Sequence, residues 1–572
     1  MGIDSTRIQR WGLALTMSVL LVVSVAAPGA GADEASAGQG FSPPEIDWQP
    51  CGQDFPGIEC ASVEVPLDYS SPRGSTTQIA LARVPASRST NNAPTVFVNP
   101  GGPGGSGVGF VTSGFGESLH ENLDGRLHVV GFDPRGVGAS DPLHCFDSED
   151  DLGSFLSAVP QFPYERDQYR PFYNHWTSLA DTCLSRGEVI AEHMSTADVA
   201  RDLDVLRQAV GDGKLTYLGF SYGSYLGTTY ANLFPQKIRA LAIDGVLDPR
   251  LWSSGWQIES DRVATQEEFD EFLRLCEEAG PQCAFADGRD TARRWKALAH
   301  SVEDEPVELG EDFLYTYDFL IGDATGAMYS PEVWGGPDGY GVFLDLVADA
   351  ALGDQSAGDQ ARIVRRNLLE RLDLRRQQEA DYDNGLDAYF GNQCADTEYP
   401  DSFSSFRAID AYARKGSRFG PLWWWFNNGC TDWPTAQDRY VGPWQAKTSA
   451  PVLVVGNFFD GVTDHAGARA TSKLLKGSRL LSYAGWGHTA YGRSECTTEF
   501  IDAYLLRGAL PPNGTVCPAN PNPFLVATTT SAASDMPMVG LPQPWLLRSQ
   551  PLAAKDNELD RRYTGLPGPY PR

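Results

Sequence analysis

The feature that most constrains this chain is the pentapeptide Gly219-Phe220-Ser221-Tyr222-Gly223 and its setting. Residues 215–218 (LTYL) before it are typical of a short buried strand, and residues 224–233 after it have apolar side chains at helical spacing. Larger side chains in place of the two glycines would clash in so tight a turn. The pattern of strand, glycine-flanked turn and helix predicts that Ser221 projects from the carboxyl edge of a sheet, with a helix N-terminus directed at it.

A serine hydroxyl needs a base to become a nucleophile, and the base needs an orienting acid. Residues 451–456 (PVLVVG) form a buried-strand pattern that leads to Asp460, and residues 479–483 (RLLSY) form a second that leads to His488. The order Ser, Asp, His is that of α/β-hydrolases, in which these groups meet where parallel strands end. We predict Ser221 as the nucleophile, Asp460 as the acid and His488 as the base. We expect His465 to lie at the surface near the start of a helix, and Asp464 to be an N-terminal residue of that helix and not the acid.

Residues 99–107 (NPGGPGGSG) follow a further strand-like run and contain five glycines and two prolines. A phosphate-binding loop would carry Lys-Ser/Thr, and a dinucleotide loop would have a different glycine spacing. An oxyanion loop fits better, in which a glycine N–H from this segment and the N–H of Tyr222 would bind the oxygen of a tetrahedral intermediate.

These motifs, together with residues 133–140 (DPRGVGAS), resemble the secreted tripeptidyl-aminopeptidase branch of the prolyl-aminopeptidase-like α/β-hydrolases. Residues 459–463 (FDGVT) and 487–488 (GH) are similar to the TAP-like C-terminal region of that family, and the resemblance spans most of residues 45–520. It implies the same catalytic residues and names Gly102 and Tyr222 as the oxyanion donors.

The resemblance also implies that Asp133 and Arg135 brace a loop rather than react. The chain departs from the family pattern at Ser224, where Thr is common, and at Asp464, where Pro is frequent. Relatives of this type include carboxylesterases, so the motifs are less specific for the substrate than for the fold.

The N-terminus is typical of a secretory signal peptide. Arg7 and Arg10 precede an apolar run over residues 11–27, and the small residues 30–32 (AGA) follow. We expect cleavage before Asp33 and a secreted, extracellular protein; the alternative is a membrane anchor. No other segment has the apolar length of a membrane span.

The ten cysteines are an even number, in agreement with export. Connectivity does not follow from sequence, and local bridges are the hypothesis: Cys51–Cys60, Cys145–Cys183, Cys276–Cys283, Cys394–Cys430 and Cys496–Cys517. The absence of a C-x-x-C pair and the scattered histidines argue against a zinc or redox site, and we expect no metal and no cofactor. A formal charge of −29 argues against a nucleic-acid partner.

Alternating strand and helix patterns predict an α/β-hydrolase fold with a mostly parallel sheet and a large helical cap insertion. We expect a signal peptide (1–32), a first core segment (33–250), the helical cap (251–440), a second core segment with the catalytic Asp and His (441–520) and a C-terminal extension (521–572). The aromatic run 423–426 (WWWF) would either line an apolar subsite or pack within the cap.

The cap should set the substrate. An aminopeptidase binds a free ammonium with buried carboxylates, and the candidates are Glu259 and Asp396, with Asp261, Glu267 and Glu268 as further possibilities. The first hypothesis is a monomeric secreted exopeptidase that removes short peptides, tripeptides above all, from peptide or protein N-termini and has no membrane partner after signal cleavage. The alternatives are a carboxylesterase or lipase-like hydrolase with the same triad, and a non-catalytic binding protein.

Overall fold

The computed structural model describes residues 41–526 except 89–92, 187–188, 287, 289, 312 and 373–381. These residues belong to one compact unit, Ser36–Arg572. The expected signal peptide and nearly all of the expected C-terminal extension lie outside the described residues.

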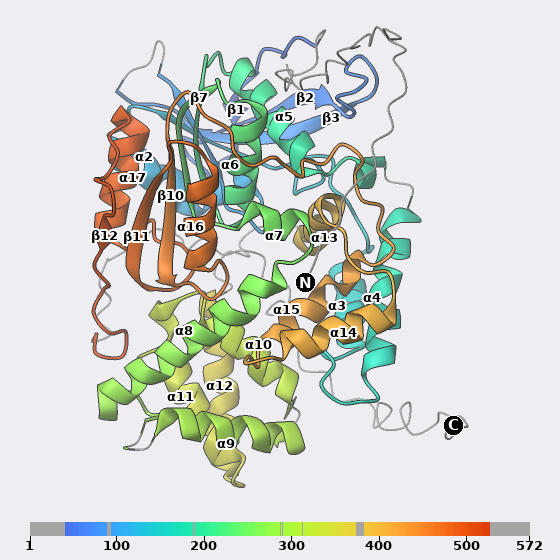
Figure 1. Cartoon of the computed structure of the whole chain (residues 1–572), viewed down its shortest axis with the longest axis vertical. Helices are drawn as coiled ribbons and strands as arrows, with labels where there is room; N and C mark the ends of the chain where they lie inside the picture. Colours follow the sequence, from blue (N-terminus) through green and yellow to red (C-terminus); the bar gives the residue numbers. More distant parts are fainter. Residues whose placement is uncertain are drawn as a thin grey trace, which may run out of the picture. The chain divides into compact units, whose positions relative to one another are not determined.

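The described residues form a ten-stranded mixed sheet, which lies in the upper part of Figure 1. Its strands, in spatial order, are β1 (Gln49–Pro50), β2 (Glu59–Pro66), β3 (Thr76–Val84), β5 (His128–Phe132), β4 (Thr95–Asn99), β6 (Leu215–Phe220), β7 (Ile238–Asp244), β10 (Val452–Phe459), β11 (Arg479–Trp486) and β12 (Val516–Cys517). The strands from β5 to β12 run parallel, whereas β1, β2 and β3 pair antiparallel. Every predicted strand lies within this sheet, and the predicted fold class is confirmed.

The central strands are buried on both faces, which is why their sequences are continuous apolar runs. Adjacent residues of β4 illustrate this: Val96 and Val98 belong to one hydrophobic cluster and Phe97 to another. The first cluster includes residues of α1 (Gly107–Phe110), α2 (Gly116–Asn122) and α17 (Glu495–Arg507). The second includes residues of α5 (Thr196–Ala209), α6 (Tyr222–Leu233) and α16 (His465–Leu474), so helices cover the sheet on both sides.

A helical region follows β7, and most of it lies below the sheet in Figure 1. It contains α7 (Pro249–Ser253), α8 (Ile258–Ala279), α9 (Thr291–Asp304), α10 (Tyr317–Ala327), α11 (Tyr340–Ala350), α12 (Gln355–Leu372), α13 (Gly385–Asp396), α14 (Phe403–Ala413), α15 (Gly420–Phe426) and a small hairpin of β8 (Val307–Glu308) and β9 (Leu314–Tyr315). Its hydrophobic cluster also includes residues of α3 (Glu149–Ser157) and α4 (Tyr169–Leu184), which precede β6 in sequence.

The aromatic run at residues 423–426 packs within this helical cluster. Trp424 and Trp425 are almost fully buried, and their indole N–H groups donate to Phe406 O and Asp410 Oδ1. Trp423 donates to Thr265 Oγ1 at 2.9 Å. The packing interpretation of the run therefore fits these contacts.

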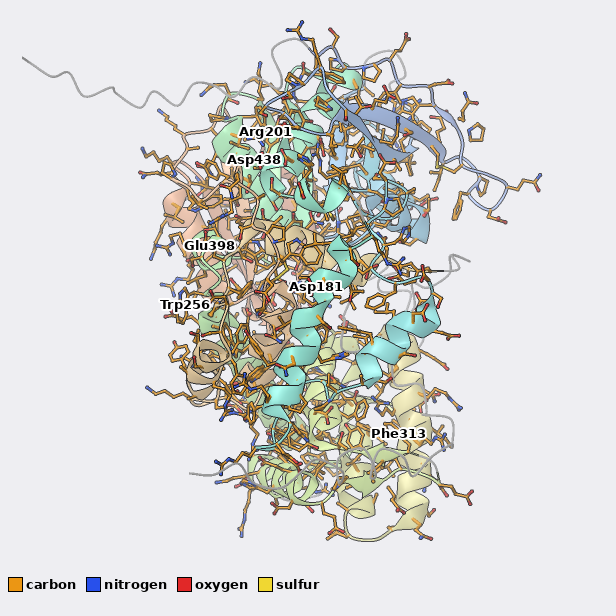
Figure 2. The ribbon with its side chains drawn as sticks, turned by 90° about the vertical axis from the view of Figure 1, so that its right-hand side faces the viewer. Asp181, Arg201, Trp256, Phe313, Glu398 and Asp438 are labelled. Atoms are coloured by element: carbon orange, nitrogen blue, oxygen red, sulfur yellow. A yellow bond between two sulfur atoms is a disulfide. The ribbon has the colours of Figure 1, made fainter. Side chains whose placement is uncertain are left out.

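Cross-links and ion pairs connect parts of the fold that are distant in sequence. The five disulfides of the structure have the pairing that the sequence suggested. Figure 2 shows Arg201 of α5 beside Asp438 of the segment that leads to β10, and their side chains form an ion pair at 2.7 Å.

Candidate active site

Ser221 lies in the sharp turn between β6 and α6. Its backbone has φ 55° and ψ −121°, a conformation that is uncommon for a residue with a side chain. A Cβ on Gly219 would lie 2.5 Å from Gly223 O, and one on Gly223 would lie 2.8 Å from Asn99 Oδ1. Both glycines are thus required by the close approach of neighbouring backbone and side-chain atoms, and the serine is held where the sequence predicted.

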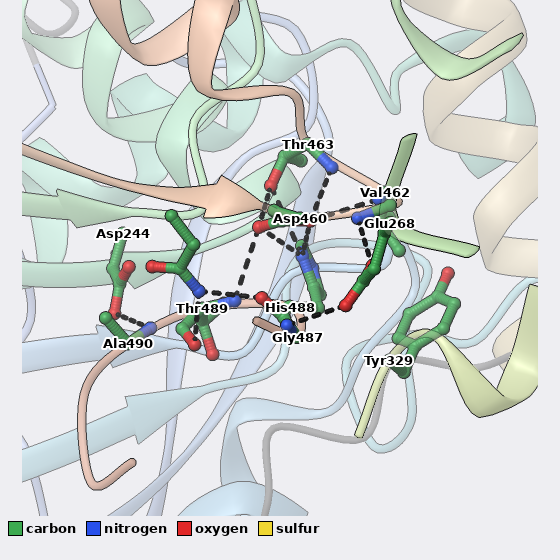
Figure 3. A network of polar contacts seen from close by, with 12 residues as sticks. Asp244, Glu268, Tyr329, Asp460, Val462, Thr463, Gly487, His488, Thr489 and Ala490 are labelled. Atoms are coloured by element: carbon green, nitrogen blue, oxygen red, sulfur yellow. Dashed lines mark hydrogen bonds and ion pairs between the residues drawn. The ribbon is translucent and has the colours of Figure 1, made fainter. Parts of the chain in front are cut away.

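Asp460 and His488 follow the carboxyl ends of β10 and β11, and their side chains meet (Figure 3). His488 Nδ1 lies 3.0 Å from Asp460 Oδ1 and 3.1 Å from Oδ2, and both side chains are almost completely buried. The carboxylate accepts only from a protonated Nδ1, so this contact leaves Nε2 of the neutral ring as a proton acceptor.

Asp460 is held in its ionised form by donors of its own loop. Val462 N and Thr463 N donate to Oδ1 at 3.0 and 2.8 Å, and the Thr463 hydroxyl donates to Oδ2 at 2.8 Å. Burial acts to raise the pKa of this carboxyl, but His488 and the Thr463 donors outweigh it, so the pKa lies below its ordinary value. The acid therefore remains an anion beside the imidazole at neutral pH.

Gly245 connects the serine turn to the histidine. Ser221 N donates to Asp244 O at 2.9 Å, and a Cβ on the next residue, Gly245, would lie 3.2 Å from His488 Cε1. His488 Nε2 is buried and makes no hydrogen bond with a described residue. The imidazole nitrogen that would accept a proton from a serine is thus free of hydrogen bonds to described residues. Its ring lies against Gly245, and the preceding residue, Asp244, accepts the hydrogen bond from Ser221 N.

The loop that carries His488 is bonded from several sides (Figure 3). Gly487 N donates to Glu268 Oε1 at 2.7 Å, and Ala490 N and Tyr491 N donate to Asp244 Oδ2 at 2.9 and 2.8 Å. Arg493 Nη1 donates to the carbonyls of residues 488 and 489, each at 2.7 Å. These contacts fix the backbone on both sides of the imidazole.

Two of the carboxyls that bind this loop have perturbed proton affinity. Burial raises the pKa of Asp244 to about 6. The Asp460 charge also raises this pKa, whereas the hydrogen bonds from two backbone N–H groups lower it. Burial and Asp460 likewise raise the pKa of Glu268 well above its ordinary value. Three buried carboxyl groups, those of Asp244, Glu268 and Asp460, thus lie near His488 or bind its loop. Groups with perturbed pKa values often cluster at functional sites.

The loop after β4 has the backbone expected of an oxyanion loop. Gly101, Gly102 and Gly104 have φ of 99°, 111° and 89°, which favour glycine. Asn99 Oδ1 accepts from Gly101 N at 3.0 Å and fixes the start of the loop. Tyr222 is the first residue of α6, and such an N–H has no partner within its helix.

Asp133 and Arg135 have the bracing contacts that the resemblance implies. Asp133 accepts from Ser106 Oγ at 2.6 Å and Ala139 N at 3.0 Å, which joins the glycine-rich loop to the loop after β5. Arg135 forms a buried ion pair with Asp202 at 2.6 Å.

The two neighbours of the acid differ from each other. Asp464 caps α16 by accepting from Ala466 N at 2.8 Å, as expected for a helix start. The prediction that His465 is a surface residue needs correction: it is partly buried, and its Nε2 lies 2.9 Å from Ser482 Oγ.

The predicted amine-binding carboxylates have varied surroundings. Glu259 and Glu267 are exposed, which does not fit the buried group that the prediction required. Asp396 is buried, and both of its oxygens accept from Thr196, whose hydroxyl also contacts Tyr222 OH. Glu268 binds backbone N–H groups of the catalytic loops instead of facing a substrate end.

Asp261 differs from these four. Its side chain is 6% exposed, and the hydrogen bond found for it is that from Gln257 Nε2 at 2.8 Å. Burial raises its pKa well above the ordinary value, and the Asp464 charge adds to the effect. No Lys, Arg or His of the described chain forms an ion pair with it.

The roles of Glu268 and Asp244 were missed at the sequence level. A signal for Glu268 exists in α8, where Thr265, Glu268 and Phe272 share one buried stripe at helical spacing. For Asp244 the signal is an acid at the end of a parallel strand, the same position that identified Asp460.

Across the described part of the chain, no helix has the length and apolar character needed to cross a bilayer. Within the same residues, no group of three or more His, Cys, Asp or Glu side chains is arranged to hold a metal ion.

Comparisons with known proteins agree with the observed fold. A family model described as alpha/beta hydrolase fold matches residues 94–274, and one described as TAP-like protein matches residues 416–517. The chain is 29% identical to serine protease Hip1 of Mycobacterium tuberculosis over 497 residues, which covers 82% of this chain and 91% of that protein. It is 29% identical to the tripeptidyl aminopeptidase of Streptomyces coelicolor, over 84% of this chain and 87% of the relative.

Carboxylesterase B of Mycobacterium tuberculosis is similar to the same extent, with 29% identity over 86% of this chain and 94% of the relative. The two family models and the observed sheet topology lead to one conclusion. The chain has the α/β-hydrolase fold of a serine hydrolase, and its residues 416–517 match the model described as TAP-like protein.

Proposed function

We propose that this protein is a secreted serine exopeptidase that releases short peptides, tripeptides above all, from free N-termini through Ser221, His488 and Asp460. The observation that carries the proposal is the buried His488–Asp460 pair, with an unengaged Nε2, beside the strained Ser221 turn. Two relatives named as a serine protease and a tripeptidyl aminopeptidase support a peptide substrate. Expected signal cleavage before Asp33 and five disulfides support secretion.

The proposed reaction is acyl transfer to water. Ser221 Oγ attacks the scissile carbonyl while His488 Nε2 takes its proton, and the Gly102 and Tyr222 N–H groups bind the oxyanion. His488 then protonates the leaving amine, which departs from the acyl-enzyme. Water attacks the ester with His488 again as base, and Ser221 recovers its proton when the acid product is released. Asp460 stays ionised and stabilises the imidazolium throughout.

Asp261 is the group we assign to the substrate ammonium. A buried carboxylate without a cationic partner is costly, and a primary ammonium would offset that cost through a charge-assisted hydrogen bond. The Asp460 and Asp261 charges both act, after burial, to raise the pKa of Tyr329, whose ring centroid lies 5.4 Å from that of His488. Asp261 is thus within electrostatic reach of a residue that packs on the catalytic base.

Asp261 also acts on Tyr389, which adjoins the glycine-rich loop. Tyr389 N lies 2.8 Å from the position of a Cβ on Gly104, and burial, Tyr399 and then Asp261 raise the Tyr389 pKa. Along α8, Asp261 precedes Glu268 by seven residues, a rise of about 10 Å. Three extended residues also span about 10 Å, which supports a tripeptide between the ammonium site and the catalytic loops.

The test uses free and N-acetylated tripeptide p-nitroanilides and p-nitrophenyl esters with four proteins: wild type, Ser221→Ala, Asp261→Asn and, as a matched control, Glu259→Gln. Glu259 is exposed on the same helix, so its variant should match wild type. Ser221→Ala should lower every turnover by about 10⁶-fold. Asp261→Asn should raise KM for free peptides by about tenfold with no change for blocked ones, since a charged hydrogen bond of about 1.5 kcal/mol is lost. Equal cleavage of free and blocked peptides by the wild type would contradict the exopeptidase proposal.

A secreted carboxylesterase is the second candidate, because the relative named carboxylesterase B has the same 29% identity. It uses the same three residues and differs in the leaving group. Under this candidate the esters would be hydrolysed far faster than any peptide amide, and Asp261→Asn would leave ester hydrolysis unchanged.

A further inference from the structure

Helix α8 contacts both loops of the proposed catalytic pair. One face of the helix presents Thr265, Glu268 and Glu271 on successive turns. Thr265 Oγ1 donates to Gly461 O at 2.5 Å, and Trp486 Nε1 donates to Glu271 Oε1 at 3.1 Å. A single helix of the helical region therefore reaches the residues that adjoin the acid and the base.

Glu268 is the residue of this face that bonds to both loops at once. Its side chain is fully buried, with Oε2 2.5 Å from Gly461 N and Oε1 2.7 Å from Gly487 N (Figure 3). Gly461 directly follows Asp460, and Gly487 directly precedes His488. One carboxyl group thus sets the separation of the two peptide segments that carry the acid and the base.

Burying an acid is costly in free energy unless its hydrogen bonds are satisfied, and an apolar contact would attach α8 to the sheet without that cost. A Cβ on Gly461 would lie 2.6 Å from Glu268 Oε2, so the loop approaches the carboxyl as closely as glycine allows. The charged groups that act on Glu268 are Asp460, which raises its pKa after the larger effect of burial, and Arg493, which lowers it. The contact is specific in both geometry and charge.

We infer that Glu268 is a positioning residue, which holds Asp460 and His488 at their working separation and makes α8 part of the catalytic apparatus. The inference rests on the proposed triad. The group does not reach the reacting atoms; it acts through the backbone of the two loops. Misplacement of a catalytic group by about 1 Å can cost about 100-fold in rate, so a small relaxation of these loops would be measurable.

The experiment compares Glu268→Ala and Glu268→Gln with Glu267→Gln in the full-length protein. Glu267→Gln is the matched control, because Glu267 is the preceding residue of the same helix and its side chain is exposed. Glu268→Ala should lower kcat by about 100-fold and leave KM within a factor of two to three. Glu268→Gln keeps one acceptor and places an NH₂ against the other N–H, so its kcat should fall by about tenfold. The rate of Ser221 labelling by a fluorophosphonate should fall in the same order.

A purely structural role would lower the melting temperature without lowering kcat of the folded enzyme. Wild-type kcat in Glu268→Ala, measured well below its melting temperature, would overturn the inference, and so would a change in KM alone. Should Glu268→Ala not fold, equal kcat values for Glu268→Gln and Glu267→Gln would overturn it instead. Turnover that survives Ser221→Ala would overturn the proposed function and this inference with it, whereas Ser221-dependent turnover unchanged at Glu268 overturns the inference alone.

Discussion

Buried acids have two different kinds of partner in two regions of this molecule. In the helical region, Asp323 of α10 pairs with Arg365 of α12 through contacts of 2.6 and 3.0 Å and also accepts from Tyr315 OH. At the catalytic edge of the sheet, Asp244 and Glu268 are held instead by backbone N–H groups. A guanidinium supplies a full charge, whereas amide dipoles supply partial ones.

This difference in partners suggests different roles: the acid paired with arginine contributes to stability, and the acids near His488 contribute to the chemistry of the site. Asp323 and Arg365 cross-link two helices, α10 and α12, through their side chains. The acids of the catalytic edge have raised proton affinity, with the Asp244 pKa at about 6, except Asp460, which His488 and Thr463 keep ionised. The substitutions below test this contrast, from the largest expected effect to the smallest.

Asp460→Asn removes the carboxylate that pairs with His488. It should lower kcat/KM by about 10⁴-fold, because the neutral amide no longer favours the His488 tautomer with Nε2 as acceptor. Steady-state kinetics with a free tripeptide p-nitroanilide measure this, with circular dichroism as the control for folding. A decrease below tenfold would show that the acid of the relay lies elsewhere.

Asp323→Ala removes the buried ion pair between α10 and α12 in the helical region. It leaves the Arg365 guanidinium buried and unpaired, which should cost about 3–5 kcal/mol of unfolding free energy. Urea unfolding followed by tryptophan fluorescence measures the loss. The kcat of the folded fraction should be unchanged, and a selective loss of kcat without loss of stability would contradict the separation of roles.

Asp244→Asn sharpens the comparison through pH. The folded pKa of about 6 lies above the reference value of 3.8, so the stability associated with this group is fully present below pH 3.8 and is lost as the pH rises through 6. The shift corresponds to about 3 kcal/mol. Asparagine keeps one oxygen for Ala490 N and Tyr491 N and cannot ionise. The variant should therefore match wild type near pH 4 and exceed it in unfolding free energy at pH 7.5.

That pH dependence is checked by urea titrations at both pH values. Parallel stability curves for wild type and variant would mean that the Asp244 carboxyl does not titrate between them. A variant that is less stable at pH 7.5 would reverse the assigned sign.

Arg274→Gln gives the smallest effect and completes the contrast within α8. Arg274 is 56% exposed and pairs with Glu271 through contacts of 2.6 and 2.8 Å and with the equally exposed Glu278 at 2.9 Å. Ion pairs of an exposed arginine contribute about 0.5 kcal/mol or less each. Urea unfolding should show a change near that size, and a loss above 1.5 kcal/mol would indicate an unrecognised packing role of the arginine stem.

The sheet and the order of its chemical groups could be predicted because parallel strands leave continuous apolar runs with polar residues at their carboxyl ends. The runs before Ser221, Asp460 and His488 all have this form, and β10 and β11 extend only a few residues further than expected. Helix α5 likewise has a local start signal, because Ser195 is its N-cap and accepts from the N–H of Asp198.

The helical region could not be predicted to the same depth. The packing of α3 and α4 with residues of α13, α14 and α15 depends on contacts between segments more than 200 residues apart, such as Asn428 Nδ2 to Tyr173 O. Local periodicity identifies each helix but not its partners. The same limitation explains the choice of Glu259 as an amine-binding residue: its residue type fits, but its side of α8 is exposed.

The disulfides have a consequence for how the chain oxidises. Each cysteine is joined to the next one along the sequence, with separations of 9, 38, 7, 36 and 21 residues. Under the proposed secretion, in which the chain emerges N-terminus first into an oxidising medium, the first cysteine of each pair would meet its native partner before any other unpaired thiol has appeared. Short loops also close at lower entropic cost than long ones. Correct bridging can thus proceed in the order of synthesis, without reshuffling of mispaired intermediates.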